Sequence, residues 1–113
     1  MTVFSGFSGY NYEFAEYPIS SNFNDGHCVY IYAKLFFGFY TPLYIGQTIH
    51  LQTRMNEHLD DGVYNCAYRH GVTHLLVHVP YAQTIADAKT ACESVERDLL
   101  MALNTPCNTQ LNS

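Results

Sequence analysis

Three segments of the chain alternate between apolar and polar positions with the period of a β-strand. They run from Cys28 to Leu35, from Leu43 to Gly46 and from Thr73 to Val79. Residues 36–42 contain a Gly and a Pro, which predicts a hairpin connection between the first two segments. We expect an antiparallel sheet of three strands with one aliphatic face and one face of tyrosines and histidines. The aliphatic face would carry Val29, Ile31, Ala33, Leu35, Leu43, Ile45, Leu75, Val77 and Val79, and the other face Cys28, Tyr30, Tyr32, Lys34, Tyr44, Gly46, His74, Leu76 and His78.

Between and after these strands the apolar period becomes that of a helix. Thr48 is expected to cap a helix that ends near Gly62 and buries a stripe of Leu51, Met55 and Leu59. Residues 63–72 are compatible with a short second helix or with a loop. The last helix begins after Thr84, which stands in capping-box spacing to Asp87, and continues to about Leu103. Its buried stripe would contain Ile85, Ala88, Cys92, Val95, Leu99 and Leu103. The pattern therefore predicts an α/β protein of the α+β type with the order strand, strand, helix, optional helix, strand, helix.

The first 26 residues have no clear period. They are rich in Tyr, Phe, Ser, Gly and Asn, and they end in the turn signal Asn24-Asp25-Gly26. So many aromatic residues argue against simple disorder. We expect residues 1–26 to form an aromatic-rich extension, either a cover strand or an irregular arm, that packs on a main domain of residues 27–113. A chain of 113 residues has room for one such core.

The composition indicates a reducing, non-membrane location. No apolar run approaches the roughly 20 residues that a membrane span requires. The N-terminal residues have neither a basic start nor an apolar core, so a secretory signal is not expected and the predicted location is cytoplasmic. The four cysteines are widely spaced and are expected to be reduced, buried thiols. A structural zinc site is the alternative, because His70, His74 and His78 recur every four residues, although the surrounding sequence does not favour a helix.

The charge argues against a protein that holds duplex nucleic acid unaided. The net charge is −5, and only five residues are Lys or Arg. Proteins that hold duplex DNA unaided usually have a basic surface, because phosphate contacts and counterion release supply much of the affinity. A nucleic-acid enzyme of this composition would grip a short stretch weakly, or depend on a metal ion, a protein partner or a homo-oligomer.

Seven residues form an ordered series with defined spacing along the chain. It consists of Tyr30, Tyr44, Gly46, Arg54, His58, Glu96 and Asn108. Arg54 follows Gly46 by eight positions and precedes His58 by four, while Glu96 is followed by an apolar stretch, Pro106 and Asn108. This series resembles the signature of the GIY-YIG nucleases. The second family tripeptide is intact as Tyr44-Ile45-Gly46, and the first would be Cys28-Val29-Tyr30, with cysteine in place of glycine. The match covers residues 28 to 108.

The resemblance implies a three-stranded GIY-YIG sheet flanked by helices and a metal-dependent endonuclease that hydrolyses DNA phosphodiesters. Glu96 would be the metal ligand, and carboxylates suit Mg²⁺ or Mn²⁺. Arg54 would hold the phosphate through its planar guanidinium. Tyr30 would help to deprotonate the attacking water, with His58 accepting or relaying the proton. The resemblance also places Tyr44 among the catalytic residues, and Gly46 and Asn108 beside the substrate.

The nuclease hypothesis also predicts a further phosphate contact and a single cleft. Lys34 lies on the predicted tyrosine face and is a candidate phosphate contact. The five catalytic residues should converge in one solvent-open cleft. The alternative function is a catalytically weak or inactive module of the same fold that binds or assembles with a partner, as the negative charge suggests.

Overall fold

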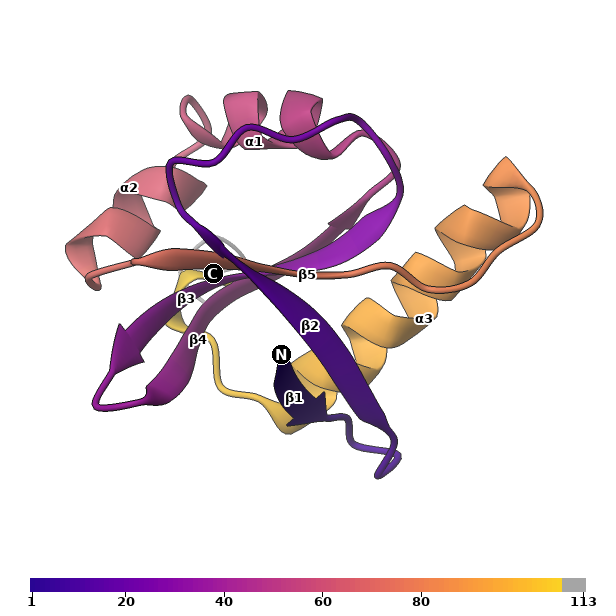
Figure 1. Ribbon diagram of the computed structural model, residues 1–113, viewed down its shortest axis with the longest axis horizontal. Coiled ribbons are helices and arrows are strands. Elements are labelled where there is room, and N and C mark those ends of the chain that lie inside the picture. The colour runs from indigo at the N-terminus through magenta and orange to yellow at the C-terminus, as the bar shows by residue number, and fades with distance from the viewer. Residues whose placement is uncertain (109–113) are drawn as a thin grey trace.

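The computed structural model describes residues 1–108 of the chain, so residues 109–113 of the predicted main domain lie outside it. Its strands and helices are, in chain order, β1 (Thr2–Ser5), β2 (Asn11–Pro18), β3 (Cys28–Phe36), β4 (Phe39–Thr48), α1 (Leu51–His58), α2 (Val63–Arg69), β5 (His74–His78) and α3 (Ile85–Ala102). This is an α+β arrangement, as the sequence predicts (Figure 1). No helix within residues 1–108 is both long and apolar enough to cross a membrane.

The sheet has five strands, not the three that the sequence predicts. Its order is β1-β2-β5-β3-β4, and every neighbouring pair is antiparallel. The three predicted strands lie together as β5-β3-β4. The N-terminal segment supplies the other two strands and extends the sheet beyond β5. Their hydrophobic period is weak because Phe14 is the only fully buried side chain in β1 and β2, so most of their stabilisation comes from strand pairing.

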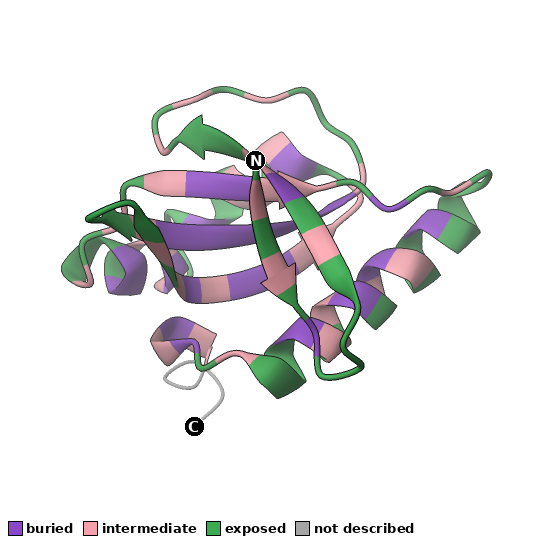
Figure 2. Ribbon diagram, turned by 60° about the horizontal axis from the view of Figure 1, so that its bottom comes forward, coloured by how far each residue is buried: buried purple, intermediate pink, exposed green. Residues whose placement is uncertain are grey.

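Helices cover both faces of the sheet: α1 and α2 lie on one side and α3 on the other (Figure 1). Buried residues therefore concentrate in the middle of the sheet and along one side of α3 (Figure 2). The core under α3 is aliphatic apart from Phe14, and it contains Val29, Ile31, Ala33, Ile45, Leu76, Cys92, Val95 and Leu99. The core under α1 and α2 contains Cys28, Tyr30, Tyr32, Leu43, Leu51, Val63, Cys66, Ala67, Leu75 and Cys107.

The predicted division of the sheet faces is wrong for β4 and β5. The pairing of β3 with β4 shifts after Tyr32, which faces Tyr44, whereas Ala33 faces Pro42. Leu43 is thus an extra residue in a β-bulge, and both it and Tyr44 pack on the side of Tyr30. In β5, Leu75 pairs with Tyr32, so the leucine joins the tyrosine face. The predicted face assignment is inverted for His74, Leu76 and His78, because these residues lie on the side of α3.

The helix caps differ in how well the sequence predicts them. The α3 prediction is confirmed: Thr84 Oγ1 accepts a hydrogen bond from the Asp87 N–H at 3.0 Å. The α1 cap prediction is wrong, because Thr48 ends β4 and its side chain accepts from the His50 N–H instead. Asp25 caps α1 from a distance, with one carboxylate oxygen accepting from the Thr53 N–H at 3.1 Å. The loop before β3 is thereby held against α1.

The cysteine prediction is correct for two residues and wrong for the other two. Cys28 and Cys92 are buried thiols, and burial raises the pKa of each. Cys66 and Cys107 form a disulfide, with Cα atoms 5.7 Å apart. These two are 41 residues apart, so no local spacing signals their pairing.

Candidate active site at the edge of the sheet

Tyr30 and Gly46 lie directly opposite each other on β3 and β4. The outer end of the Tyr30 ring lies so close to Gly46 that a Cβ atom there would overlap with the tyrosine hydroxyl and ring. Because β4 is an edge strand, the hydroxyl reaches toward the rim of the sheet. The absence of a side chain at position 46 is therefore a packing requirement of Tyr30.

Gly46→Ala is expected to destabilise the fold by about 1–3 kcal/mol, the cost of overpacking a close-packed core. The Tyr30 ring can move little, because the whole residue is only 1% exposed. Urea unfolding of the two proteins measures the difference. Gly26→Ala is the matched control, since a Cβ at Gly26 has open space around it. Equal stability of the Gly46 variant and the parent would contradict this packing.

A chain of hydrogen bonds leads from Tyr30 to the surface. The Tyr30 hydroxyl lies 2.5 Å from His58 Nε2, and His58 Nδ1 lies 3.0 Å from Asp61 Oδ2. The neutral imidazole that satisfies both contacts carries its proton on Nδ1, donates it to Asp61 and accepts from Tyr30 at Nε2. His58 is fully buried, whereas Asp61 reaches solvent. Tyr30 and His58 thus lie beneath the surface and not on the open wall of a cleft.

The burial of His58 corrects the expected helix stripe. α1 packs Leu51 and His58 into the core, with Met55 against it, while Leu59 is exposed. A buried polar ring is tolerated here because both of its nitrogens have partners. Burial lowers the pKa of His58 below its usual 6.5, and the nearby Arg54 lowers it further, while Asp61 opposes the shift. His58 is therefore neutral at pH 7.

Arg54 carries the positive charge at the centre of the residue cluster around Tyr30 and His58. Its guanidinium lies 3.6 Å from Glu57 and 3.7 Å from Asp61, and its side chain is one-third exposed. Burial raises the pKa of both Tyr30 and Tyr44, and the positive charge of Arg54 opposes each shift. The same charge also favours ionisation of Glu96. Arg54 therefore acts electrostatically on residues of β3, β4 and α3.

Glu96 approaches this cluster from α3, on the other side of the β4 edge. Its carboxylate is half-buried, and burial raises its pKa, as does the like charge of Glu93. Among residues 1–108 no side chain forms a hydrogen bond or an ion pair with it. A shallow, open pocket of about 470 Å³ lies against this carboxylate. It is lined by Gln47, Glu93, Glu96, Arg97, Leu100 and Met101.

The cluster thus brings together the five predicted catalytic residues, two of which are buried. Tyr44 packs beside Tyr30 and His58, with ring centroids 6.2 and 5.2 Å away. Glu96 raises the pKa of Tyr44, so the α3 carboxylate and the β4 phenol are also electrostatically coupled. The arrangement offers a cation, a carboxylate and a buried proton acceptor at one edge of the sheet.

The other two predicted substrate residues lie differently. Lys34 is four residues beyond Tyr30 along β3, about 13 Å at the rise of a strand. Its side chain passes beside Gly71, and its Nζ lies 5.1 Å from the centre of the Phe36 ring. Asn108 pairs with the backbone of Ile45: its Oδ1 accepts from the N–H at 2.8 Å, and its Nδ2 donates to the C=O at 2.9 Å. Asn108 therefore binds the β4 edge between Tyr44 and Gly46, while Lys34 stands apart from the cluster.

Asp61 is the residue that the sequence interpretation omits. It orients His58, pairs with Arg54 and accepts from the Val63 N–H at the start of α2. Its position three residues after His58 is the only local signal. That signal is weak, because α1 ends before Asp61 and helical spacing alone does not bring the two side chains together.

A divalent cation is compatible with the donor set of this edge. The Glu96 carboxylate is a hard oxygen ligand of the type that Mg²⁺ and Mn²⁺ prefer, and Glu93 lies one turn away on the same pocket wall. Burial and like charge make the unpaired Glu96 carboxylate costly, and a cation would offset both effects. The residues therefore fit such an ion with Glu96 as its protein ligand.

No protein-family model matches this chain, and neither a curated protein nor a solved structure is significantly similar to it.

Proposed function

We propose that the protein is a small GIY-YIG-type endonuclease that hydrolyses phosphodiester bonds in DNA with the help of one Mg²⁺ or Mn²⁺ ion. The observation that carries this proposal is the cluster around Arg54. Its guanidinium lies 3.7 Å from Asp61, which orients His58 toward the Tyr30 hydroxyl. Its charge also favours ionisation of Tyr44 and Glu96, which come from a strand and another helix. The order of elements after residue 27 and the polar series support the same assignment. Under this proposal, the five-stranded sheet of the protein consists of a three-stranded family core and an additional N-terminal hairpin.

The proposal gives each residue a role in the reaction. Arg54 binds the reacting phosphate and stabilises the charge that develops on it. Tyr30 takes a proton from the attacking water as its own proton passes to His58 Nε2, and Asp61 stabilises the imidazolium that results. Tyr44 orients the phosphate or the water from the β4 side. When bound at Glu96, the cation supplies charge neutralisation at the phosphate and at the leaving oxygen.

In this proton path, Tyr30 depends on His58 to take up its own proton. A phenol with a raised pKa is a poor base by itself. His58 changes that, since it is neutral at pH 7 and lies within hydrogen-bonding distance. The two residues can therefore act as one acceptor, with Asp61 at the outer end.

The test is a cleavage assay on supercoiled, single-stranded and branched DNA, with an RNA of the same sequence as the single strand. We expect cleavage of DNA that requires Mg²⁺ or Mn²⁺ and stops on chelation. The affinity should be weak and should fall only gently with salt, because few phosphates can be neutralised by the cations of this chain. Binding without cleavage of any substrate, with either ion, would reject the enzyme.

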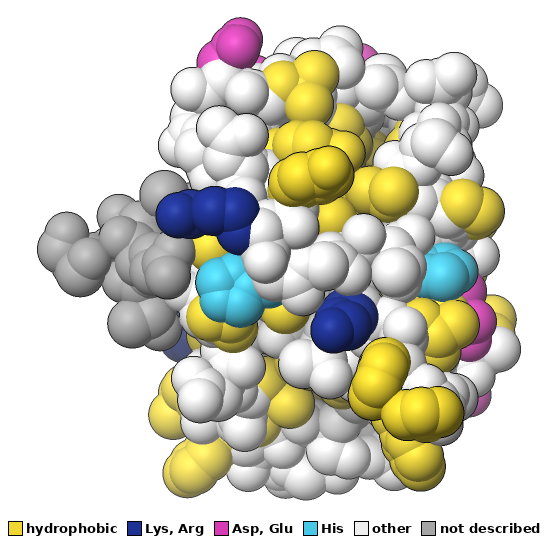
Figure 3. Space-filling model, turned by 90° about the vertical axis from the view of Figure 1, so that its left-hand side faces the viewer, with side chains coloured by type: hydrophobic (Ala, Val, Ile, Leu, Met, Phe, Trp, Pro, Cys, Tyr) yellow, Lys and Arg dark blue, Asp and Glu magenta, His cyan; other side chains and the backbone are white. Residues whose placement is uncertain are grey.

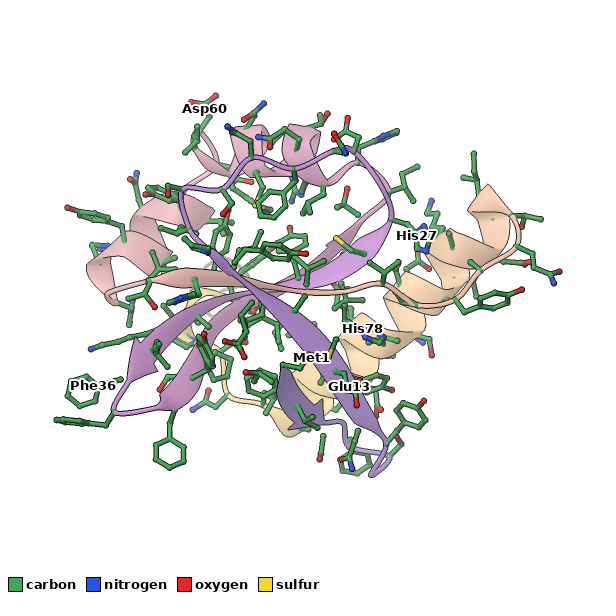
Figure 4. The ribbon with its side chains drawn as sticks, viewed as in Figure 1. Met1, Glu13, His27, Phe36, Asp60 and His78 are labelled. Carbon is green, nitrogen blue, oxygen red and sulfur yellow. A yellow bond between two sulfur atoms is a disulfide. The ribbon has the colours of Figure 1, made fainter. Side chains whose placement is uncertain are left out.

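The second candidate function is a binding or assembly module that works with a protein partner or a second copy of the chain. The tip of the β3–β4 hairpin favours it, because Phe36, Phe37 and Phe39 are exposed there, Phe37 at 85%. Phe36 projects from the free end of the hairpin (Figure 4). On the side of the molecule where this hairpin lies, hydrophobic side chains gather beside Lys and Arg side chains (Figure 3). We propose a cytoplasmic location for either function, as the sequence predicts.

A further inference from the structure

Three potential metal-ligating groups meet where α2 ends against the C-terminal segment. Cys66 lies within α2, His70 follows its last residue and Cys107 lies next to Asn108. One ligand atom from each residue lies within 4.8 Å of those of the other two. Both cysteines are buried, and His70 is half-buried, so the imidazole marks the side that faces solvent.

We propose that Cys66, His70 and Cys107 form a Zn²⁺ site when the disulfide is reduced. Two thiolates and an imidazole are soft and borderline ligands, which favour Zn²⁺ over the Mg²⁺ or Mn²⁺ expected at Glu96. Water would complete the tetrahedron. The proposal is independent of the nuclease function, because it rests on other side chains.

The local geometry supports metal binding as well as disulfide formation. Cys66 and His70 are four residues apart, so they lie on the same side of the helix end. His70 Nδ1 is 3.9 Å from Cys66 Sγ and 2.9 Å from the Cys66 carbonyl oxygen. Cys107 completes the set from the other side, and its Cα is 5.7 Å from that of Cys66. Small side-chain rotations would therefore bring the three ligand atoms around one ion.

The two states interconvert with balanced chemistry. A phosphine reductant and one water convert the disulfide to two thiols, and the phosphine becomes its oxide. Zn²⁺ then binds the two sulfurs as thiolates and displaces two protons. Removal of the metal and oxidation by a disulfide-class oxidant restore the bond, with the two electrons passing to the oxidant.

Either state holds the same two segments together. α2 begins two residues after Asp61, whose side chain accepts from the Val63 N–H. Cys107 precedes Asn108, which binds the Ile45 backbone beside Tyr44 and Gly46. A disulfide or a zinc ion between Cys66 and Cys107 thus joins the two chain segments that flank the edge of β4.

The experiment uses the full chain, reduced with tris(2-carboxyethyl)phosphine and freed of it under inert gas. Co²⁺ is the spectroscopic probe, and Zn²⁺ competes with it. We expect one Co²⁺ per chain, with a sulfur-to-cobalt charge-transfer band and tetrahedral d–d bands that Zn²⁺ removes. The oxidised protein should show none of these bands.

Variants separate this site from the other thiols. Cys66→Ser and Cys107→Ser should lose the charge-transfer band, and His70→Ala should weaken binding at least about tenfold, the lower end of what loss of even an outer-shell partner costs. The double variant Cys28→Ala/Cys92→Ala should bind as the parent does, because those two thiols are outside the site. His70→Ala retains both sulfurs, so it tests the site even where a cysteine variant fails to fold. Absence of stoichiometric binding to the reduced parent, or full affinity in the His70 variant, would overturn the proposal.

Discussion

Glu96→Gln is expected to reduce the proposed metal-dependent DNA cleavage at least about a thousandfold, because a neutral amide would not hold the cation to which the proposed mechanism assigns several kcal/mol of charge stabilisation. The same variant should unfold at a slightly higher urea concentration than the parent. Its carboxylate is half-buried without a hydrogen-bonding or ion-pair partner among residues 1–108, and its pKa is raised by burial, so the charged form destabilises the fold. Single-turnover cleavage over a range of Mg²⁺ concentrations and urea unfolding measure the two effects.

Glu93→Gln is the matched control for this result. Glu93 and Glu96 line the same pocket on the same helix, so the two variants remove equal charge from nearly the same place. Glu96 interacts electrostatically with Arg54 and Tyr44. We therefore expect the Glu93 variant to retain most of its activity. Cleavage by the Glu96 variant at the parent rate throughout the Mg²⁺ range would eliminate it as the metal ligand.

Glu96 and His58 make the stability of the fold depend on pH in opposite directions. The folded-state pKa of Glu96 lies above its usual 4.5, so its cost to stability appears as pH rises through that raised pKa. His58 has a lowered pKa, and it therefore contributes stability that is fully present above 6.5 and declines as pH falls below that value. Both groups lie in the same cluster. The half-buried Glu96 carboxylate therefore costs stability near neutral pH, which is typical of residues retained for function.

The elements that the sequence predicts well are those with strong local signals. α3 has a capping residue and an acidic first turn, and its cap forms as expected. Of its predicted apolar stripe, Ala88, Cys92, Val95 and Leu99 are buried, whereas Ile85 is 75% exposed. β3 alternates over its predicted length and is an interior strand of the sheet, with β5 paired on one side and β4 on the other. Local propensity, hydrophobic period and tertiary environment agree in both elements, so short-range patterns are sufficient.

The elements that the sequence misses depend on long-range contacts. β1 and β2 are held by pairing and by Asp98, whose carboxylate accepts hydrogen bonds from Ser8 and from the Tyr12 hydroxyl. α1 is capped by Asp25, 28 residues away from Thr53. The bulge at Leu43 reverses one face assignment without any glycine or proline at that residue. None of these features produces a period in the sequence.

The candidate site also combines features that the sequence predicts with features that depend on long-range contacts. The order of polar residues predicts which side chains gather, whereas their depth follows from details that the order does not contain. Gly46 allows Tyr30 to cross the edge strand, and Asp61 allows His58 to be buried. Lys34 has the correct face for the site but lies too far along the strand. Residue spacing within a strand predicts which face of the sheet a side chain lies on. It does not predict how far that side chain is from a site formed with other elements.

Tyr30→Phe and Arg54→Ala are each expected to reduce the cleavage rate at least about a hundredfold. In the proposed mechanism, the first variant removes the hydroxyl that would pass the proton of water to His58, and the second removes the guanidinium that would face the phosphate. Tyr30→Phe should also destabilise the fold by about 1–3 kcal/mol, because His58 Nε2 would lose its buried partner. Arg54→Lys should recover part of the activity, since lysine keeps the charge but not the planar pair of donors.

Tyr32→Phe is the control that separates proton transfer from packing. Tyr32 lies two residues from Tyr30 on the same face, is equally buried, and donates its hydroxyl to Met55 Sδ at 3.1 Å. Its loss also removes a buried hydroxyl from the core, but that hydroxyl has no contact with His58 Nε2. Cleavage near the parent rate in Tyr32→Phe, with a large loss in Tyr30→Phe, would assign the effect to the Tyr30–His58 pair. Near-parent cleavage in both the Tyr30 and the Arg54 variants would instead favour the binding module, because an enzyme that uses this cluster cannot spare both residues.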